Sequence, residues 1–407
     1  MPFQELFNQI EKLRPQMVNT LMRLIRIPAI GPENGGDGEL KKAELLKEIL
    51  QDLGFHDIDQ YEAEDQRVPS GKRPNLIAYY RGKADSPKLW IVTHLDVVPA
   101  EENQWTITKP FEPTLKDGKV YGRGTSDNGQ SMVSSIFAIQ ALKQLAIKPK
   151  RTVALAFVAD EEHGSNHGIQ NLIKKNLFSK RDLVIVPDSG EPNGAFIEVS
   201  EKSILWFKVV TKGKQTHASI PNTGLNAHRV GMQFSLALDD LLHKKYNKKD
   251  KHFNVPISTF EPTRKDKNVE AVNIVPGEDV VYFDCRILPQ YDIKEVLSDI
   301  KETAEAFEQK SGATISTEII QTQQAPAAVD AKSEVVTLLK KAIKTARGLD
   351  AKVGGIGGGT CAAFFRKAGI PAVVWSTVEE VAHQPDEYSK VQNMVDDAKV
   401  FAVLSVM

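Results

Sequence analysis

The sequence predicts an α/β fold in which a mainly parallel-sheet domain is interrupted by a smaller, inserted α+β domain. Its 407 residues are more than one hydrophobic core usually serves, so two domains are expected. Short apolar runs alternate with helix-like stretches in the first half of the chain and again near its end. From about Ser203 to Pro326 a different order of strands and helices appears. We therefore divide the chain into 1–202, 203–325 and 326–407, and expect the outer two segments to form one domain.

The outer segments contain apolar runs with the length and composition of buried strands. These runs cover residues 75–80, 89–93, 152–159, 183–186 and 372–376. Apolar residues at helical spacing predict helices at 3–13, 40–53, 131–145 and 333–347. Gly54 is placed to end the second of these helices. Strands that alternate with helices favour a largely parallel sheet.

The inserted segment has its own order of elements. We expect strands at 204–211, 256–260, 271–275, 280–287 and 313–320, and helices at 224–242 and 293–307. This order approximates the split β-α-β arrangement of a ferredoxin-like sandwich, in which two helices cover an antiparallel sheet.

Composition argues against nucleic acid and membranes as partners. The formal net charge is −1, and we interpret the lysine-rich run 243–252 as a solvated loop. No stretch approaches the roughly 18 to 20 apolar residues that cross a bilayer, and the N-terminus lacks the pattern of a signal peptide. The two cysteines, Cys285 and Cys361, lie far apart and indicate no disulfide framework. We therefore expect a cytoplasmic location with reduced thiols.

Acidic and imidazole side chains gather where predicted strands end. They are His94, Asp96, Asp127, Asp160, Glu161, Glu162 and Asp188. Asp127 differs from the others because it precedes the helix predicted at 131–145. Open α/β sheets bind ligands at the carboxyl ends of their strands, so the joint placement is more informative than any one of these residues.

Carboxylates crowded at one sheet edge repel each other unless a cation lies between them. A mixture of His, Asp and Glu without Cys indicates zinc, manganese or cobalt. The neighbours Glu161 and Glu162 allow one carboxylate to bind a metal while the other acts as general base. Taken alone, Asp127 is equally suited to cap a helix and Asp188 to start a turn.

Two other patterns are weaker. His163 and His167 are four residues apart, as in a helical zinc motif, but Gly164 separates them and no Glu follows His163. We interpret both histidines as polar residues near the site. The glycine-rich run 354–359 lacks the Lys-Ser/Thr ending of a phosphate loop, so we expect a loop that lets the backbone approach a small ligand.

With these motifs in this order, the sequence resembles the dinuclear-zinc family of aminoacylases, acetylornithine deacetylases, succinyl-diaminopimelate desuccinylases and glutamate carboxypeptidases. The resemblance extends from His94 to His383 and rests on a His-x-Asp, a Gly-Arg-Gly-x-x-Asp, a Glu-Glu pair, an Asp after a strand and a late His. It implies a hydrolase that cleaves an amide bond of a small carboxylate-bearing substrate, either a dipeptide or an N-acyl amino acid. The hydrolysis would use metal-activated water and a Glu general base.

The resemblance also implies the roles of individual residues. One ion would be held by His94 and Asp188, the other by Glu162 and His383, and both by Asp127. Zinc is the expected metal, with cobalt and manganese as alternatives. Asp96 would orient His94, and Glu161 would be the general base. Without the resemblance, His383 is one of nine histidines and nothing selects it.

For the inserted domain, the resemblance implies a lid and dimer interface, and hence a homodimer. Thr216-His217-Ala218-Ser219 is similar to the segment whose His reaches a neighbouring subunit's active site. The positions expected to hold substrate are Asn273, Arg286, Gly359 and Thr360.

The chain departs from the family pattern at two positions. Asn128 follows the bridging Asp where relatives commonly continue into Lys-Gly, and Cys361 follows Gly-Gly-Thr where many have a polar or acidic residue. The Gly-Arg-Gly-Thr-Ser-Asp stretch is similar to the dipeptidase branch and Thr-His-Ala-Ser to the deacylase branch, so both activities stay open. A non-catalytic ligand-binding relative is disfavoured by the intact Glu161 and ligand positions, and a two-metal phosphoesterase by the lack of a Lys or Arg cluster beside the acids.

Overall fold

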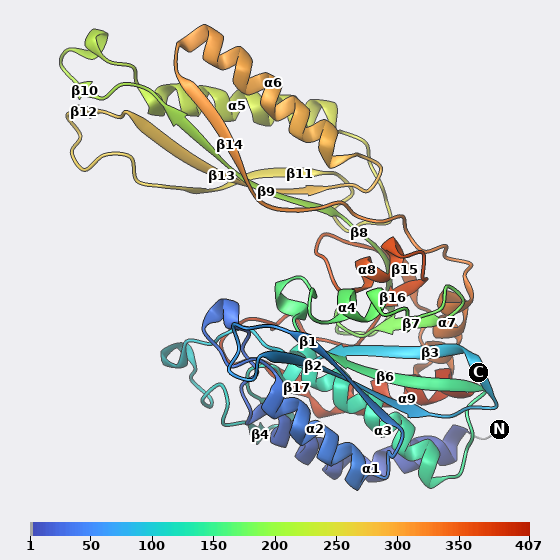
Figure 1. Cartoon of the computed structure of the whole chain (residues 1–407). Helices are drawn as coiled ribbons and strands as arrows, with labels where there is room; N and C mark the ends of the chain where they lie inside the picture. The colour runs from blue at the N-terminus through green and yellow to red at the C-terminus, as the bar shows by residue number, and fades with distance from the viewer. Residues whose placement is uncertain (1–2) are drawn as a thin grey trace. The chain divides into compact units, whose positions relative to one another are not determined.

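In a computed structural model that describes residues 3–407, the chain divides into two compact units (Figure 1). The first takes in the chain up to Val199 together with Ala328–Val353 and Thr360–Met407. The second consists of Ser200–Ala327 and Gly354–Gly359. The lid and dimer roles of the inserted segment stay predictions.

An eight-stranded sheet forms the centre of the first unit, and its last two strands continue into residues of the second. In order of pairing its strands are β1 (Ile58–Glu64), β2 (Lys72–Tyr80), β6 (Arg151–Val158), β3 (Ala84–His94), β7 (Leu183–Val186), β16 (Ala372–Val374), β8 (Phe196–Glu201) and β15 (Lys352–Ile356). The central strands β6, β3, β7 and β16 are parallel, as expected. The sheet as a whole is mixed, because β1 pairs antiparallel with β2, β2 with β6, and β8 with β16.

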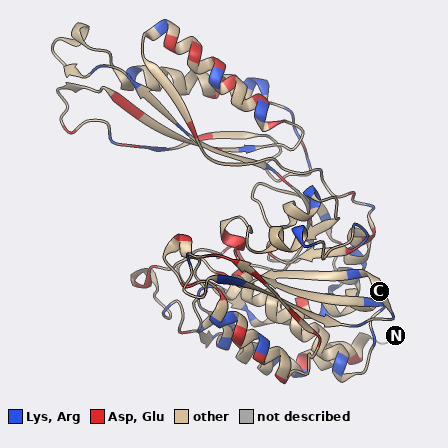
Figure 2. Ribbon diagram, in the orientation of Figure 1, with Lys and Arg blue, Asp and Glu red and all other residues tan. Residues whose placement is uncertain are grey.

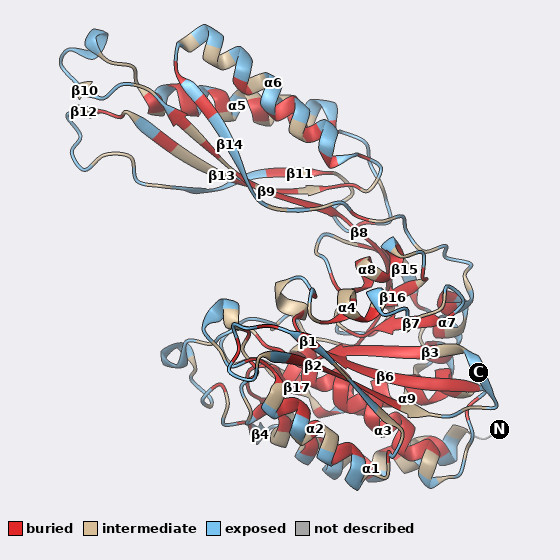
Figure 3. Cartoon of the chain, viewed as in Figure 1, coloured by how far each residue is buried: buried red, intermediate tan, exposed pale blue. Residues whose placement is uncertain are grey.

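Helices cover both faces of this sheet. They are α1 (Phe3–Ile25), α2 (Leu40–Asp52), α3 (Gln130–Gln144), α4 (Ile169–Lys174), α7 (Glu334–Arg347), α8 (Ala362–Lys367) and α9 (Val391–Val406). Along β6, Leu155 and Phe157 enter one core with α1, α3 and α9, whereas Ala154 and Ala156 enter a second core with α4 and α8. The strands are thus buried on both sides, which is why they are continuous apolar runs in the sequence (Figure 3).

The second unit is a four-stranded antiparallel sheet with two helices. Its strands pair in the order β11 (Thr259–Lys265), β13 (Glu278–Ile287), β9 (Ser203–Lys212) and β14 (Thr314–Gln323), and its helices are α5 (Ala227–Lys245) and α6 (Ile293–Ser311). In α6, the Asp292 side chain accepts the N–H of Lys294, and Gly312 at φ +75° ends the helix. Acidic and basic residues intersperse along the exposed face of α6 (Figure 2). The predicted fold class, a mainly parallel α/β domain with a ferredoxin-like insertion, is confirmed.

One predicted strand does not join this four-stranded sheet. The run 271–275 contributes only β12 (Ile274–Val275), which pairs with β10 (Thr216–His217) in a separate two-stranded ribbon. The segment before Ile274 is exposed and lies outside the ladder, so its apolar residues do not indicate a longer strand.

A small three-stranded sheet completes the first unit. It is formed by β17 (Tyr388–Lys390), β5 (Lys119–Tyr121) and β4 (Thr114–Lys116). Because β5 precedes the Gly-Arg-Gly-Thr-Ser-Asp segment and β17 follows the late histidine, their pairing brings these two motifs together. Within residues 3–407, no helix is both long and apolar enough to span a membrane.

Candidate metal centre

Three neighbouring parallel strands place candidate ligands at one edge of the sheet. His94 is the last residue of β3, Glu162 follows β6, and Asp188 follows β7. Parallel strands end at the same edge, so residues far apart in the sequence become neighbours there. Asp127 reaches this edge from the loop that leads into α3.

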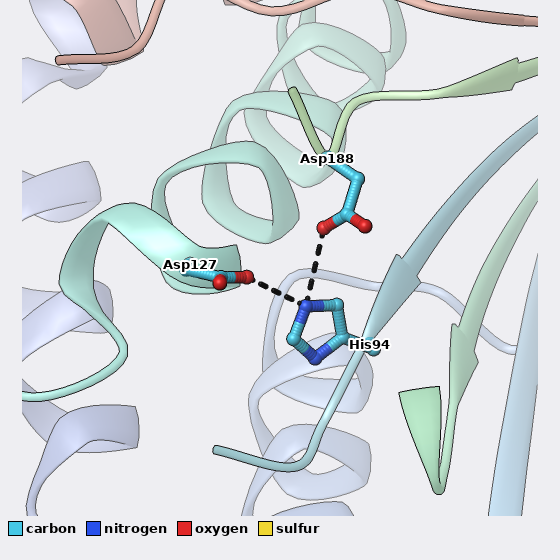
Figure 4. A group of neighbouring side chains, drawn as sticks. All are labelled: His94, Asp127 and Asp188. Carbon is cyan, nitrogen blue, oxygen red and sulfur yellow. Dashed lines mark hydrogen bonds and ion pairs between the residues drawn. The ribbon is translucent and has the colours of Figure 1, made fainter. Parts of the chain in front are cut away.

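The first group of candidate ligands is His94, Asp127 and Asp188 (Figure 4). His94 Nε2 lies 2.8 Å from Asp127 Oδ1 and 3.2 Å from Asp188 Oδ1. The ligand atoms of all three residues lie within 4.8 Å of one another, which is close enough for one ion to contact each of them.

The second group is Asp127, Glu162 and His383. His383 Nε2 lies 3.1 Å from Asp127 Oδ2 and 3.2 Å from Glu162 Oε2. The two carboxylate oxygens of Asp127 therefore face different histidines, Oδ1 toward His94 and Oδ2 toward His383. This is the geometry of a carboxylate shared between two ion positions.

The charges in the two groups depend strongly on each other. Burial disfavours the imidazolium of His94, yet hydrogen bonds to Asp127 and Asp188 raise its pKa well above the usual range. Asp127 and then Glu162 raise the pKa of His383 to about 10. Burial and the nearby Asp127 raise the pKa of Glu162 to about 7. The crowded carboxylates thus favour the positively charged forms of the two histidines. Divalent cations can supply the same positive charge.

Asp96 contacts both His94 and the loop that carries Glu161 and Glu162. His94 Nδ1 lies 3.0 Å from the backbone oxygen of Asp96 and 3.5 Å from its carboxylate. The Asp96 carboxylate also accepts the backbone N–H groups of Glu161 and Glu162, at 3.1 and 3.0 Å. Although burial opposes ionisation, these contacts hold the pKa of Asp96 below its usual range. Asp96 therefore anchors the loop that carries the Glu pair as well as contacting His94.

Glu161 lies outside both groups of candidate ligands. Its Oε1 accepts the backbone N–H of Cys361 at 3.1 Å. Burial and then the charge of Asp188 raise the pKa of the Glu161 carboxyl well above its usual range. A carboxyl that holds a proton more readily than usual is suited to accept one near neutral pH.

Sequence reasoning gave no role to Asn128, although its position departs from the family pattern. The Asn128 amide nitrogen donates to Asp188 Oδ1 at 2.7 Å and to the backbone oxygen of Pro187 at 3.0 Å. This side chain therefore orients a candidate ligand. The departure from the motif was the one signal in the sequence that could have drawn attention to it.

The remaining predicted site residues lie in other surroundings. His217 and Asn273 are neighbours in the second unit, where the backbone oxygen of Asn273 accepts the N–H of Ala218, and both are exposed. Arg286 forms a two-point ion pair with Asp284, at 2.6 and 3.0 Å.

Gly359 and Thr360 occupy the loop between β15 and α8. Gly359 belongs to the second unit and Thr360 to the first, where the Thr360 hydroxyl accepts the N–H of Ala362 at 3.2 Å. His163 contacts the Asn34 amide, and His167 contacts Asp160; neither histidine joins a candidate metal group among residues 3–407.

Comparison with known proteins agrees with this geometry. An uncharacterized metallohydrolase of Methanocaldococcus jannaschii is 41% identical over 394 residues, which cover 93% of this chain and 96% of that protein. A succinyl-diaminopimelate desuccinylase of Alkalilimnicola ehrlichii is 24% identical over 363 residues, covering 88% of this chain and 91% of that one. A solved dipeptidase of Saccharomyces cerevisiae has the same fold, with a TM-score of 0.73 at 19% identity and coverage of 99% and 98%. Residues 90–405 match Peptidase family M20/M25/M40, and the chain is therefore a metal-dependent hydrolase that belongs to this family.

Proposed function

We propose that the chain hydrolyses an amide bond in a small carboxylate-bearing substrate, a dipeptide or an N-acyl amino acid, with two divalent ions bound at one site. The observation that carries this proposal is the arrangement of Asp127, whose two oxygens each face a different histidine. His94 and Asp188 would hold one ion, and Glu162 and His383 the other.

The donor set fits zinc. It offers two imidazoles and three carboxylates, and no thiolate, which suits zinc and also cobalt or manganese. The raised pKa of Glu162, caused by burial and then by Asp127, reflects a lack of positive charge among the carboxylates. Two divalent ions at these positions would activate water as the nucleophile and polarise the substrate carbonyl.

Glu161 is the proposed general base. It is adjacent in sequence to a ligand but is in neither ligand group, so its carboxylate is available to take a proton from the attacking water. The contact with the Cys361 N–H fixes one oxygen of Glu161. Returning the proton to the leaving amine would complete the cycle with the same residue.

We further propose a homodimer in which His217 stabilises the oxyanion in the partner's site. In this chain Ser219 N–H donates to His217 Nδ1 at 3.1 Å, and the Ser219 hydroxyl lies 2.7 Å from the same atom. These contacts leave Nε2 as the ring atom for a substrate. Asn273, Arg286, Gly359 and Thr360 would bind the substrate's carboxylate and backbone.

Two of the similar proteins support the proposed substrate class. One relative is a desuccinylase and a protein of the same fold is a dipeptidase, which are both amide hydrolases of small molecules. A panel of dipeptides, N-acetyl and N-succinyl amino acids, assayed with zinc, cobalt or manganese, would identify the substrate. Metal content measured in parallel should reach two ions per chain. Hydrolysis of phosphate esters in place of all these amides would contradict the proposal.

A test of His217 uses two variants that should both be inactive, Glu161→Gln and His217→Ala. Removing an oxyanion donor should lower turnover by about 10² to 10³. If His217 acts across a dimer, mixing the two variants creates some sites with both residues intact, and part of the activity returns. No recovery despite demonstrated subunit exchange would place His217 outside the partner's site.

A further inference from the structure

The segment that leads into β17 contains a fully buried carboxylate for which the proposed mechanism has no role. Glu387 is 0% exposed. Its Oε1 accepts the backbone N–H groups of Ser126 at 2.8 Å and Asp127 at 3.1 Å. Its Oε2 accepts the N–H of Gly124 at 3.0 Å and the Arg123 guanidinium at 2.6 Å. Four donors from one loop therefore converge on a single side chain.

These N–H groups need an acceptor because no helix provides one. They lie at the start of a distorted π-helical turn, Thr125–Gly129, and the first N–H groups of a helical turn have no partner within it. Asp127 itself has a non-helical backbone, with φ −117° and ψ 91°. In a buried loop, leaving several donors without partners would be costly, and the Glu387 carboxylate satisfies three of them.

The same contacts join two segments that carry ligands of the second ion. Asp127 is on the loop that Glu387 holds, and His383 lies four residues before Glu387. The backbone strengthens this connection, because Gly122 N–H donates to the Glu387 carbonyl at 2.9 Å and β5 pairs with β17 directly beyond it. Glu387 thus connects the two segments whose ligand atoms, His383 Nε2 and Asp127 Oδ2, lie 3.1 Å apart.

We propose that Glu387 is a positioning residue that sets the spacing of Asp127 and His383, and thereby the affinity for the second ion. This inference rests on the proposed two-ion site. It differs from a purely structural role, in which the buried Glu387–Arg123 pair would stabilise the fold and leave ion binding unchanged.

The test is Glu387→Gln, which keeps the size of the side chain but replaces one acceptor oxygen with an NH₂ group facing N–H donors. Zinc binding to the metal-free chain is measured by competition with a chelator, and unfolding of the metal-free chain is followed by circular dichroism. The affinity for the second ion should fall by about 10- to 100-fold, as for other partners that orient metal ligands.

A matched control is Glu198→Gln. Glu198 is also buried and also pairs with a buried guanidinium, Arg366, at 2.8 and 3.1 Å. It joins β8 to α8, neither of which carries a candidate ligand. This variant should lower the unfolding temperature and leave both zinc affinities within about threefold of wild type.

Wild-type affinity for both ions in a folded Glu387→Gln chain overturns the inference, and so does an equal loss of affinity in the Glu198→Gln control. If Glu387→Gln does not fold, Glu387→Asp keeps the charge and shortens the reach by one methylene. It should weaken the second ion, and wild-type affinity in that variant overturns the inference as well. A wild-type chain that binds fewer than two ions overturns the proposed function, and with it this inference.

Discussion

The two candidate ion positions share Asp127 but differ in how the chain holds their other ligands. At the first position, the side chains of His94 and Asp188 are 2% and 10% exposed. Asp96 contacts His94, and Asn128 donates a hydrogen bond to Asp188. At the second position, the side chain of His383 is 52% exposed, and the residue lies in an irregular segment rather than at the end of a strand of the main sheet. A buried, hydrogen-bonded ligand loses less freedom on binding a metal than an exposed one. We therefore expect the first ion to bind more tightly and the second to exchange more readily.

The largest expected effect is that of Asp127→Ala. Because Asp127 contributes an oxygen to each position, this variant should lose both ions and all measurable turnover. His383→Ala should lose the second ion and keep the first. Metal analysis after dialysis against a chelator distinguishes the two variants. Retention of one tightly held ion in Asp127→Ala would contradict a shared carboxylate.

Glu161→Gln separates catalysis from metal binding, because Glu161 belongs to neither ion position. Turnover should fall by about 10² or more, since the amide has the shape of the carboxylate but cannot take a proton. The metal content should stay at two ions per chain. Near-normal turnover with intact metal would assign the base to another residue, and Asp160 is the next candidate.

The strand-end residues of both positions could be singled out from the sequence pattern, whereas His383 could not. His94 ends β3 and Asp188 lies two residues after β7, and both strands are apolar runs because helices cover both faces of the sheet. His383 lies in an irregular segment between β16 and β17, and only the family resemblance selected it. The strands β5 and β17, whose pairing brings that segment to Asp127, are three residues each, and so short a run carries no periodicity.

Other features of the fold also leave no local pattern in the sequence. Helix α9 was not predicted: twelve of its sixteen residues are buried, and its polar stripe of Gln392, Asp396 and Lys399 is narrow. The contacts of Asp96 with Glu161 and Glu162, and of Asn128 with Asp188, join loops from different strands. Such contacts depend on tertiary structure and leave no local pattern in the sequence.

A smaller effect is expected for Asn128→Ala. Removing the amide that donates to Asp188 should weaken the first ion by about 10- to 100-fold. The second ion should be less affected, which is the opposite of the outcome expected for Glu387→Gln. Asn128→Asp is a stricter test, because it replaces the donor with a carboxylate beside Asp188. If either variant weakens both ions equally, the two positions are not held independently.

The smallest expected effect is a difference in how the two affinities depend on pH. In the metal-free chain the pKa of His383 is raised to about 10, first by Asp127 and then by Glu162, and the pKa of His94 is also raised well above its usual range. A metal-binding imidazole must be neutral, so each ion displaces one proton at neutral pH, and each affinity should rise about tenfold per pH unit. Burial and then Asp127 raise the pKa of Glu162 to about 7, so below pH 7 the second ion must displace a proton from this carboxyl too. Its affinity should therefore fall more steeply than that of the first ion between pH 7 and pH 6, approaching a hundredfold per unit at lower pH.

Cobalt titrations with chelator competition from pH 6 to pH 8 measure both slopes, and Glu162→Gln should remove the extra steepness. Equal slopes for the two ions below pH 7 would show that Glu162 releases no proton when the second ion binds.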